Sequence, residues 1–201
     1  KAPYEASENI TLYAHWTANK YTVTFNGNGG SNGTSIKKTY NTVLGTLPTS
    51  TRQGYRFKGW YTASTGGSKI AETTKMPPND ITYYAQWERI NYTITYNLNG
   101  GNVEGNPTNY NIESETITLN NPTRRGYTFN GWTGSNGTTA QETVTIPKGS
   151  TENKNYSANW KVNKYKLKID PNSGIYNNSK EKTIIEGYYD TTIQIGEPIA
   201  P

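Results

Sequence analysis

The heptapeptide Gly-Tyr-Arg-Phe-Lys-Gly-Trp at residues 54–60 returns as Gly-Tyr-Thr-Phe-Asn-Gly-Trp at residues 126–132. Its alternating aromatic residues are typical of a β-strand with one buried face, because successive side chains of a strand point to opposite sides. The tryptophan breaks this alternation, and the isolated glycine before it marks a β-bulge. The motif therefore predicts a bulged strand that turns Trp60, and likewise Trp132, onto the core.

Two further motifs recur on either side of this strand. A segment that opens like Tyr-Thr-Val-Thr-Phe and a segment that ends with Ala-x-Trp each occur three times, at residues 21–30, 92–101 and 165–174 and at residues 10–16, 81–87 and 154–160. Such self-similarity at a fixed period is the signature of a repeat architecture. The sequence therefore predicts a tandem array of units of about 70 residues.

The motif order divides the chain into four parts. Residues 17–89 and 90–161 are complete repeats, residues 1–16 are the C-terminal tail of a preceding repeat, and residues 162–201 are the N-terminal part of a further one. Four residues, none of them Gly or Pro, separate each closing Trp from the next opening Tyr. Flexible linkers are rich in Gly and Ser. The equal joints therefore predict that each closing strand leads directly into the next repeat and that the array is elongated.

The composition indicates that the units are β-rich and small. Only 31% of the residues are hydrophobic and the mean hydropathy is −0.88, yet 12% are aromatic, which a disordered chain would lack. Strand-forming Thr and Tyr and turn-forming Gly and Asn are frequent. We predict a core built on aromatic rings and on the two bulge glycines, comprising Tyr21, Phe25, Tyr55, Phe57, Gly59, Trp60, Trp87, Tyr92, Tyr127, Phe129, Gly131, Trp132 and Trp160.

Most catalytic and metal chemistry is disfavoured by what the sequence contains. There is no Cys, and His15 is the only His, so a His-based triad or a two-His metal site cannot be built within one chain. The acidic residues do not recur at equivalent positions, as a shared pair of catalytic carboxylates would. The Asn- and Gly-rich loop at residues 26–33 has no carboxylate for calcium. We expect no catalytic residue, no cofactor and no metal.

The charge and the exposed rings leave a binding function as an alternative. The net charge is +5 and the pI is near 9.2, but residues 21–87 carry seven basic against two acidic residues while residues 92–160 carry four against five. An array that binds nucleic acid or another anionic polymer would repeat its charge. Tyr13 and Tyr84 are predicted to face outward and could stack on sugars. A weak anionic-ligand patch is predicted at Lys37, Lys38, Arg52, Arg56 and Lys58.

Several motifs in one order resemble a known family. The segments at residues 21–25, 55–61, 65–67 and 76–87 together resemble the internalin B-repeat, or Listeria–Bacteroides repeat, family. The likeness covers essentially all of residues 17–89. It weakens in the second repeat, where Trp-Thr-Gly-Ser-Asn-Gly replaces the usual Trp-Tyr and Thr-Gly-Gly, and Thr-Ile-Pro replaces the usual Met-Pro.

The resemblance implies a fold and a role. It implies an α+β, β-grasp-like unit with a reduced helix, in tandem in large extracellular proteins of bacteria that are often attached to the cell wall. It implies no enzymatic activity, and it supplies no ligand residues. The implied role is a stalk that displays an adhesive domain, with neighbouring repeats of the chain as partners and no membrane insertion by this segment. The alternative is an adhesin module that recognises host glycan or protein through exposed Tyr and Lys.

Overall fold

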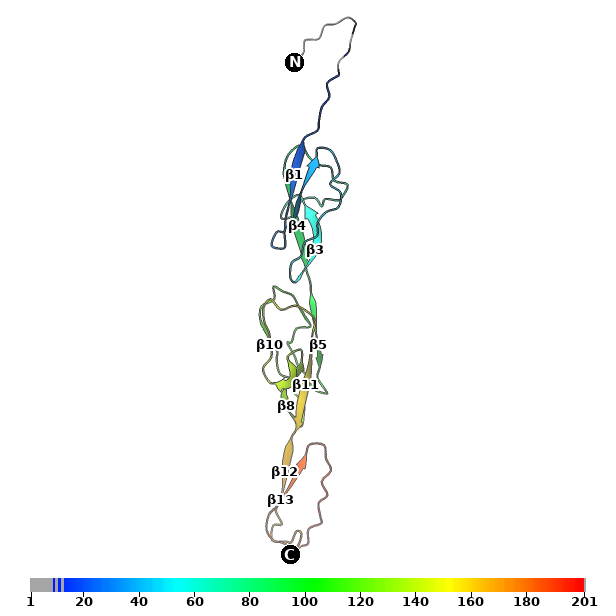
Figure 1. Ribbon diagram of the computed structural model, residues 1–201. Coiled ribbons are helices and arrows are strands. Elements are labelled where there is room, and N and C mark those ends of the chain that lie inside the picture. The colour runs from blue at the N-terminus through cyan, green and yellow to red at the C-terminus, as the bar shows by residue number, and fades with distance from the viewer. Residues whose placement is uncertain (1–8, 10, 12, 201) are drawn as a thin grey trace. The chain divides into compact units, whose positions relative to one another are not determined.

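The computed structural model describes residues 9, 11 and 13–200 (Figure 1). The chain divides into two units, residues 1–89 and 90–201. All regular elements of the described residues are β-strands, and none is a helix. The β-rich prediction is confirmed. The reduced helix expected of a β-grasp-like unit is absent from the described part, where irregular loops connect the strands instead.

The first unit contains one mixed sheet of four strands. Its elements are β1 (Lys20–Asn26), β2 (Gly33–Thr39), β3 (Tyr55–Tyr61) and β4 (Ile81–Arg89), in the spatial order β2-β1-β4-β3. The opening strand β1 and the closing strand β4 are parallel neighbours at the centre, and the other two pairings are antiparallel. Parallel neighbours need a long connection. Here β2, the loops and β3 form that connection, and they are arranged around the central pair.

The bulge predicted in the Gly-Tyr-x-Phe-x-Gly-Trp strand is confirmed. The register of β3 against β4 shifts between Phe57 and Gly59, and Gly59 has a φ of +129° that other residues rarely adopt. As a result Trp60 is buried beside Phe25 and Phe57, with ring centroids 4.9 and 5.3 Å away. The buried core of this unit comprises Val23, Phe25, Leu44, Trp60, Ile70, Met76, Tyr83 and Ala85.

The second unit repeats this plan with two additions. Its main sheet has the order β6-β5-β11-β8-β9, again with the opening strand β5 parallel to the closing strand β11. The added strand β9 forms a hairpin with β8, and β7 and β10 form a separate small sheet. The strands are β5 (Tyr92–Asn97), β6 (Asn109–Tyr110), β7 (Ile117–Thr118), β8 (Tyr127–Gly134), β9 (Gly137–Gln141), β10 (Thr145–Ile146) and β11 (Lys154–Val162).

The remainder of the second unit is a hairpin of β12 (Lys164–Ile169) and β13 (Thr183–Tyr188). At the other end of the chain, residues 13–19 are exposed and lie outside any strand. The predicted closing strand at residues 10–16 is therefore not formed over its described part. Ile10 and Leu12, which the sequence predicts to face inward, lie outside the described residues.

Candidate functional site

The closing tryptophan of each complete repeat locks the loop that follows the opening strand. In the first repeat the Trp87 Nε1–H donates to the Gly27 carbonyl at 3.0 Å. The ring covers Gly30 so closely that a Cβ there would overlap it. Close packing therefore requires the second glycine of the Gly-Gly pair, while the first, Gly29, has a φ of +88° that favours glycine. The second repeat has the same contacts, made by Trp160, Leu98 and Gly101.

An asparagine amide fastens the same loop to the closing strand. Asn28 has a φ of +46°, and its Nδ2 donates to the Ala85 carbonyl at 3.0 Å and to the Ser64 carbonyl at 2.9 Å. Asn99, at φ +48°, donates to the Ala158 carbonyl at 2.8 Å. Each amide nitrogen thus ties its loop to the main chain of the closing strand. No group of three or more His, Cys, Asp or Glu side chains suited to a metal occurs among the described residues.

An arginine packs over the first tyrosine of each bulged strand. The Arg52 guanidinium lies 3.9 Å from the Tyr55 ring centroid, and that of Arg124 lies 3.7 Å from the Tyr127 centroid. Both rings are half-buried and lie outside the hydrophobic clusters, although the sequence predicts them as core. Such cation–π contacts stabilise by about 0.5–1 kcal/mol at exposed sites. The recurrence of Arg-x-Gly-Tyr was the signal that would have revealed the pair.

The other predicted core residues lie in or against the two clusters. Phe25, Trp60 and Trp132 are buried, and the remaining rings are half-buried and packed on them. The half-buried set is Tyr21, Phe57, Trp87, Tyr92, Phe129 and Trp160. Gly131, like Gly59, has a positive φ at a register shift.

The five predicted anion-binding residues do not form one patch. Lys37 and Lys38 are on β2, and Arg56 and Lys58 are on β3 at the opposite edge of the sheet. Lys37 and Lys38 are adjacent strand residues, so they point to opposite faces. Arg56 is 3.9 Å from the Glu88 carboxylate, and Arg52 covers Tyr55. The first repeat therefore spreads its positive charge over both edges of the sheet.

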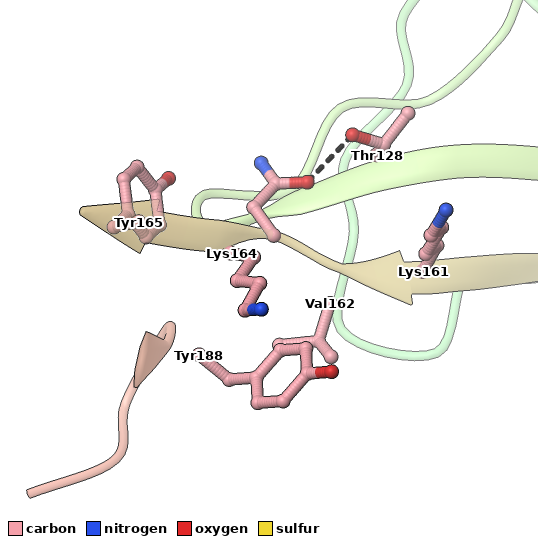
Figure 2. Close-up of a pocket in the computed structure, with 7 residues that line it drawn as sticks. Thr128, Lys161, Val162, Lys164, Tyr165 and Tyr188 are labelled. Atoms are coloured by element: carbon pink, nitrogen blue, oxygen red, sulfur yellow. Dashed lines mark hydrogen bonds between the residues drawn. The ribbon is translucent and has the colours of Figure 1, made fainter. Parts of the chain in front are cut away.

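The joint between the second repeat and the β12–β13 hairpin is closed by three hydrogen bonds. The Asn163 N–H donates to the Gly126 carbonyl at 2.9 Å, and the Thr128 hydroxyl donates to the Asn163 side-chain oxygen at 2.6 Å (Figure 2). The Tyr189 N–H then donates to the Asn163 carbonyl at 2.9 Å. Asn163 thus connects the start of β8 to the end of β13, and the joint has a defined structure.

An aromatic residue that directly follows the hairpin packs on the same joint. The Tyr189 ring covers Gly126, which has a φ of +77°, so closely that a Cβ at Gly126 would overlap it. It also meets the Tyr127 ring edge-on, with centroids 5.9 Å apart. An open hollow of about 590 Å³ lies beside the joint, with Lys164 at its margin (Figure 2). Lys164 also forms an ion pair with Glu186. Gly126 therefore provides both a tight turn and the space for the ring of the next repeat.

Comparison with known proteins identifies these units. The family model of the Listeria-Bacteroides repeat domain matches residues 21–86 and again residues 92–163. The chain belongs to this family. The two matched ranges coincide with the two sheets that carry the tryptophan, asparagine and arginine contacts described above. The predicted resemblance is thereby confirmed.

Individual relatives of this Listeria-Bacteroides repeat chain are much longer proteins. Internalin H of Listeria monocytogenes is 46% identical over 84 residues, which is 41% of this chain and 15% of that protein. Two proteins of Evansella cellulosilytica, provisionally named a membrane protein and a Gly-rich membrane protein, are 32% and 31% identical over 94% and 85% of this chain. The chain spans 28% and 19% of their lengths. Among the described residues, no helix has the length and apolar character needed to cross a membrane.

Proposed function

We propose that this repeat segment is a non-enzymatic stalk of a bacterial cell-surface protein, which holds an adhesive or other functional domain away from the cell. Its membership of the Listeria-Bacteroides repeat family and its similarity to Internalin H support a surface role. The observation that carries the stalk role is the structured joint around Asn163. A spacer works only if its joints keep their angle.

The joint contacts give this rigidity a physical basis. Each of the three hydrogen bonds contributes about 0.5–1.5 kcal/mol net, and an edge-on aromatic pair adds about 0.5–1.5 kcal/mol. Bending the joint would break these contacts together, because Asn163 takes part in all three bonds. A Gly/Ser linker of the same length has no such contacts and samples many directions.

The adhesin alternative requires features that the repeats share on their surfaces. Tyr84, the predicted sugar-stacking ring, is half-buried, and Ser157 stands at the equivalent place of the closing motif. The basic residues of the first repeat are divided between two sheet edges. What the two repeats do share are the structural contacts of Trp87, Asn28 and Arg52. This pattern favours a spacer over a ligand-binding module.

The stalk is tested by the distance distribution across the joint. Spin labels placed on β9 and on β13 should give one narrow distribution in the intact chain. Replacement of residues 161–164 by Gly-Ser-Gly-Ser should broaden it, because this removes the Asn163 bonds and frees the backbone. A broad distribution in the unmodified chain would refute the rigid joint.

The spacing of the repeats in the full chain gives a second test of the stalk. A domain of this size has a radius of gyration of about 11 Å, so a stalk should place the centres of consecutive repeats on the order of 30–40 Å apart. Small-angle scattering of the full chain that fits a compact globule would exclude a spacer. Saturable binding of a host glycan, lost on Tyr84→Ser, would favour the adhesin.

A further inference from the structure

The opening and closing strands of each complete repeat are parallel neighbours, and the chain enters the repeat by one and leaves it by the other. In the first repeat these strands are β1 and β4, and in the second they are β5 and β11. Because parallel strands begin on the same side, the entry to β1 and the exit from β4 lie at opposite ends of the pair. Tension along the chain therefore pulls the two strands in opposite directions along their common axis.

This direction of pull loads the hydrogen bonds between the two strands in shear. The bonds of a parallel pair run across the strands at even spacing, so sliding one strand along the other strains all of them together. The antiparallel pair of β3 and β4 behaves differently, because Tyr55 at the start of β3 is level with Arg89 at the end of β4. A pull on those two neighbouring ends breaks the bonds one after another. An equal number of bonds thus resists shear better than it resists peeling.

The backbone ladder between the opening and closing strands is short and has the same register in both repeats. Residues 23–26 are level with residues 81–84, and residues 94–97 are level with residues 154–157. These four residue pairs compare with six between β3 and β4. A parallel ladder is also slightly less stable per residue than an antiparallel one. Backbone pairing alone would therefore make this a modest junction.

A side chain that directly precedes the closing strand extends the ladder at its start. The Thr22 N–H donates to a carboxylate oxygen of Asp80 at 2.7 Å. In the second repeat the Thr93 N–H donates to the side-chain oxygen of Asn153 at 2.9 Å. Aspartate and asparagine differ in charge but share this acceptor oxygen. The bond across the strand pair is therefore what the two repeats have in common at this position.

Two further side chains extend the ladder at its other end. The amide of Asn28 and the indole of Trp87 each form a hydrogen bond between the opening segment and β4. Asn99 and Trp160 form the equivalent bonds between the opening segment of the second repeat and β11. Each repeat thus has three side-chain bonds across the same strand pair as its backbone ladder. Together they lengthen the junction at both ends.

We propose that the opening and closing strands of each complete repeat form a mechanical clamp, which keeps the repeat folded when the chain is under tension. The role of the clamp rests on the proposed stalk function, because a displayed domain that holds a target transmits its pull through every repeat behind it. Its geometry does not involve the joint at Asn163. Forced unfolding is governed by the unfolding rate, so the clamp sets the lifetime of a repeat under load.

The direction of pull tests the clamp in the full chain. The chain has no Cys, so two introduced cysteines give unique attachment points for an optical trap. Lys20→Cys with Glu88→Cys pulls β1 and β4 in shear, whereas Gln53→Cys with Glu88→Cys peels β3 from β4. All three side chains are exposed. The first repeat should unfold at a higher force in shear than in peeling, and equal forces in the two directions would overturn the clamp.

Two substitutions matched in the bonds they remove separate the clamp from general stability. Asn28→Gly removes bonds to the Ser64 and Ala85 carbonyls, the second of which crosses the clamp, and glycine tolerates the φ of +46°. Gln86→Ala removes two bonds to carbonyls of the loop at residues 63–66, which is not part of the clamp. Under constant tension in shear, Asn28→Gly should shorten the lifetime of the repeat roughly fivefold, the factor for one net hydrogen bond. Gln86→Ala should leave the lifetime nearly unchanged.

The start of the ladder offers a second matched pair. Asp80→Ala removes the acceptor of the Thr22 N–H and should also shorten the lifetime roughly fivefold in shear. Asp80→Asn retains the acceptor oxygen, as Asn153 does in the second repeat, and should behave like the unmodified side chain. Equal lifetimes of Asn28→Gly and Gln86→Ala, or of the two Asp80 variants, would overturn the clamp and leave the rigid joint of the stalk standing. A broad distance distribution across the joint would refute the rigid stalk without changing these lifetimes.

Discussion

The two complete repeats share their contacts but differ in the polar parts of their cores. Trp60 donates its indole N–H to the Pro48 carbonyl at 2.6 Å, whereas the Trp132 indole nitrogen is fully buried and has no partner among the described residues. Phe25 of the first repeat is replaced by Tyr96, whose hydroxyl donates to the Pro107 carbonyl at 2.9 Å. The two repeats thus have their aromatic rings and their strand register in common, but the hydrogen-bond partners of those rings differ.

The largest expected effect tests what the repeats have in common. Trp60→Ala and Trp132→Ala should each reduce the free energy of unfolding of their own repeat by about 3–5 kcal/mol, because each leaves a large cavity in a buried aromatic cluster. Each loss is large enough to unfold a unit of about 70 residues. Differential scanning calorimetry should show one transition lost or lowered in each variant.

The control for this experiment is Tyr13→Ala, since Tyr13 is exposed and outside any strand. It should melt like the unmodified chain. If Trp60→Ala also melted like the unmodified chain, the bulged strand would not be what holds the core of the first repeat.

A smaller effect separates the two repeats. Trp60→Phe removes a hydrogen bond worth about 1 kcal/mol net, whereas Trp132→Phe removes an unpaired buried donor whose burial costs at least about 1 kcal/mol. Both changes lose the same ring volume. The first should therefore destabilise its repeat by about 2 kcal/mol more than the second destabilises its own. Equal losses in urea unfolding would mean that the Trp132 indole nitrogen is satisfied in solution.

The sequence predicted local features well because they depend on nearby residues. The bulge at Gly59 follows from the position of a glycine between aromatic residues of opposite parity, and the loop glycines follow from turn chemistry. The basic residues between Lys37 and Arg56 are near in sequence, but β1 and β4 intervene between β2 and β3 in the sheet. That separation depends on strand order, which residue spacing does not reveal.

The hydrogen-bond partners of the core rings could not be predicted from the sequence for a related reason. The carbonyl that accepts from Trp60 belongs to the loop at Pro48, and the equivalent loop of the second repeat contains the β7 strand. The seat of Tyr189 on Gly126 also escaped prediction, because the residue that occupies it comes from the following repeat. Only the equal lengths of the joints indicated that the contact would be ordered.

Alkaline pH should separate the repeats further. Burial, and secondly the neighbouring Tyr156, raises the pKa of Tyr96 to about 12 from its usual 10.0, and burial also raises the pKa of Tyr110 and of Tyr156. A raised pKa in the folded state contributes stability below pH 10 that is lost as the pH rises towards 12. In the first repeat burial raises the pKa of Tyr83, and Phe25 cannot ionise.

The second repeat should therefore lose more stability than the first between pH 10 and pH 12. Thermal unfolding followed at both ends of this range measures the difference, and Tyr96→Phe should reduce it. If the two transitions moved together, or if Tyr96→Phe left the shift unchanged, the phenol cluster would not be its cause.

The smallest effect concerns the β12–β13 hairpin, which has no complete core and holds ion pairs on its exposed face. Hydrogen bonds from Lys164, and then from Lys166, lower the pKa of the Glu186 carboxyl, and the bond from Lys182, followed by that from the Asn172 N–H, lowers the pKa of Asp170. A lowered pKa in the folded state contributes stability above the usual values of 4.5 and 3.8 that is lost as the pH falls below them.

Because the Glu186 and Asp170 carboxyls are fully exposed, solvent and salt screen them, and the hairpin should loosen only slightly in acid. Amide exchange should show faster opening of β12 and β13 at acidic pH, with little change in β1 and β5. Glu186→Gln should produce part of that loosening at neutral pH, and high salt should remove the difference. Equal protection of the hairpin on both sides of the carboxyl pKa values would show instead that the contacts of Asn163 and Tyr189, and not the ion pairs, hold it in place.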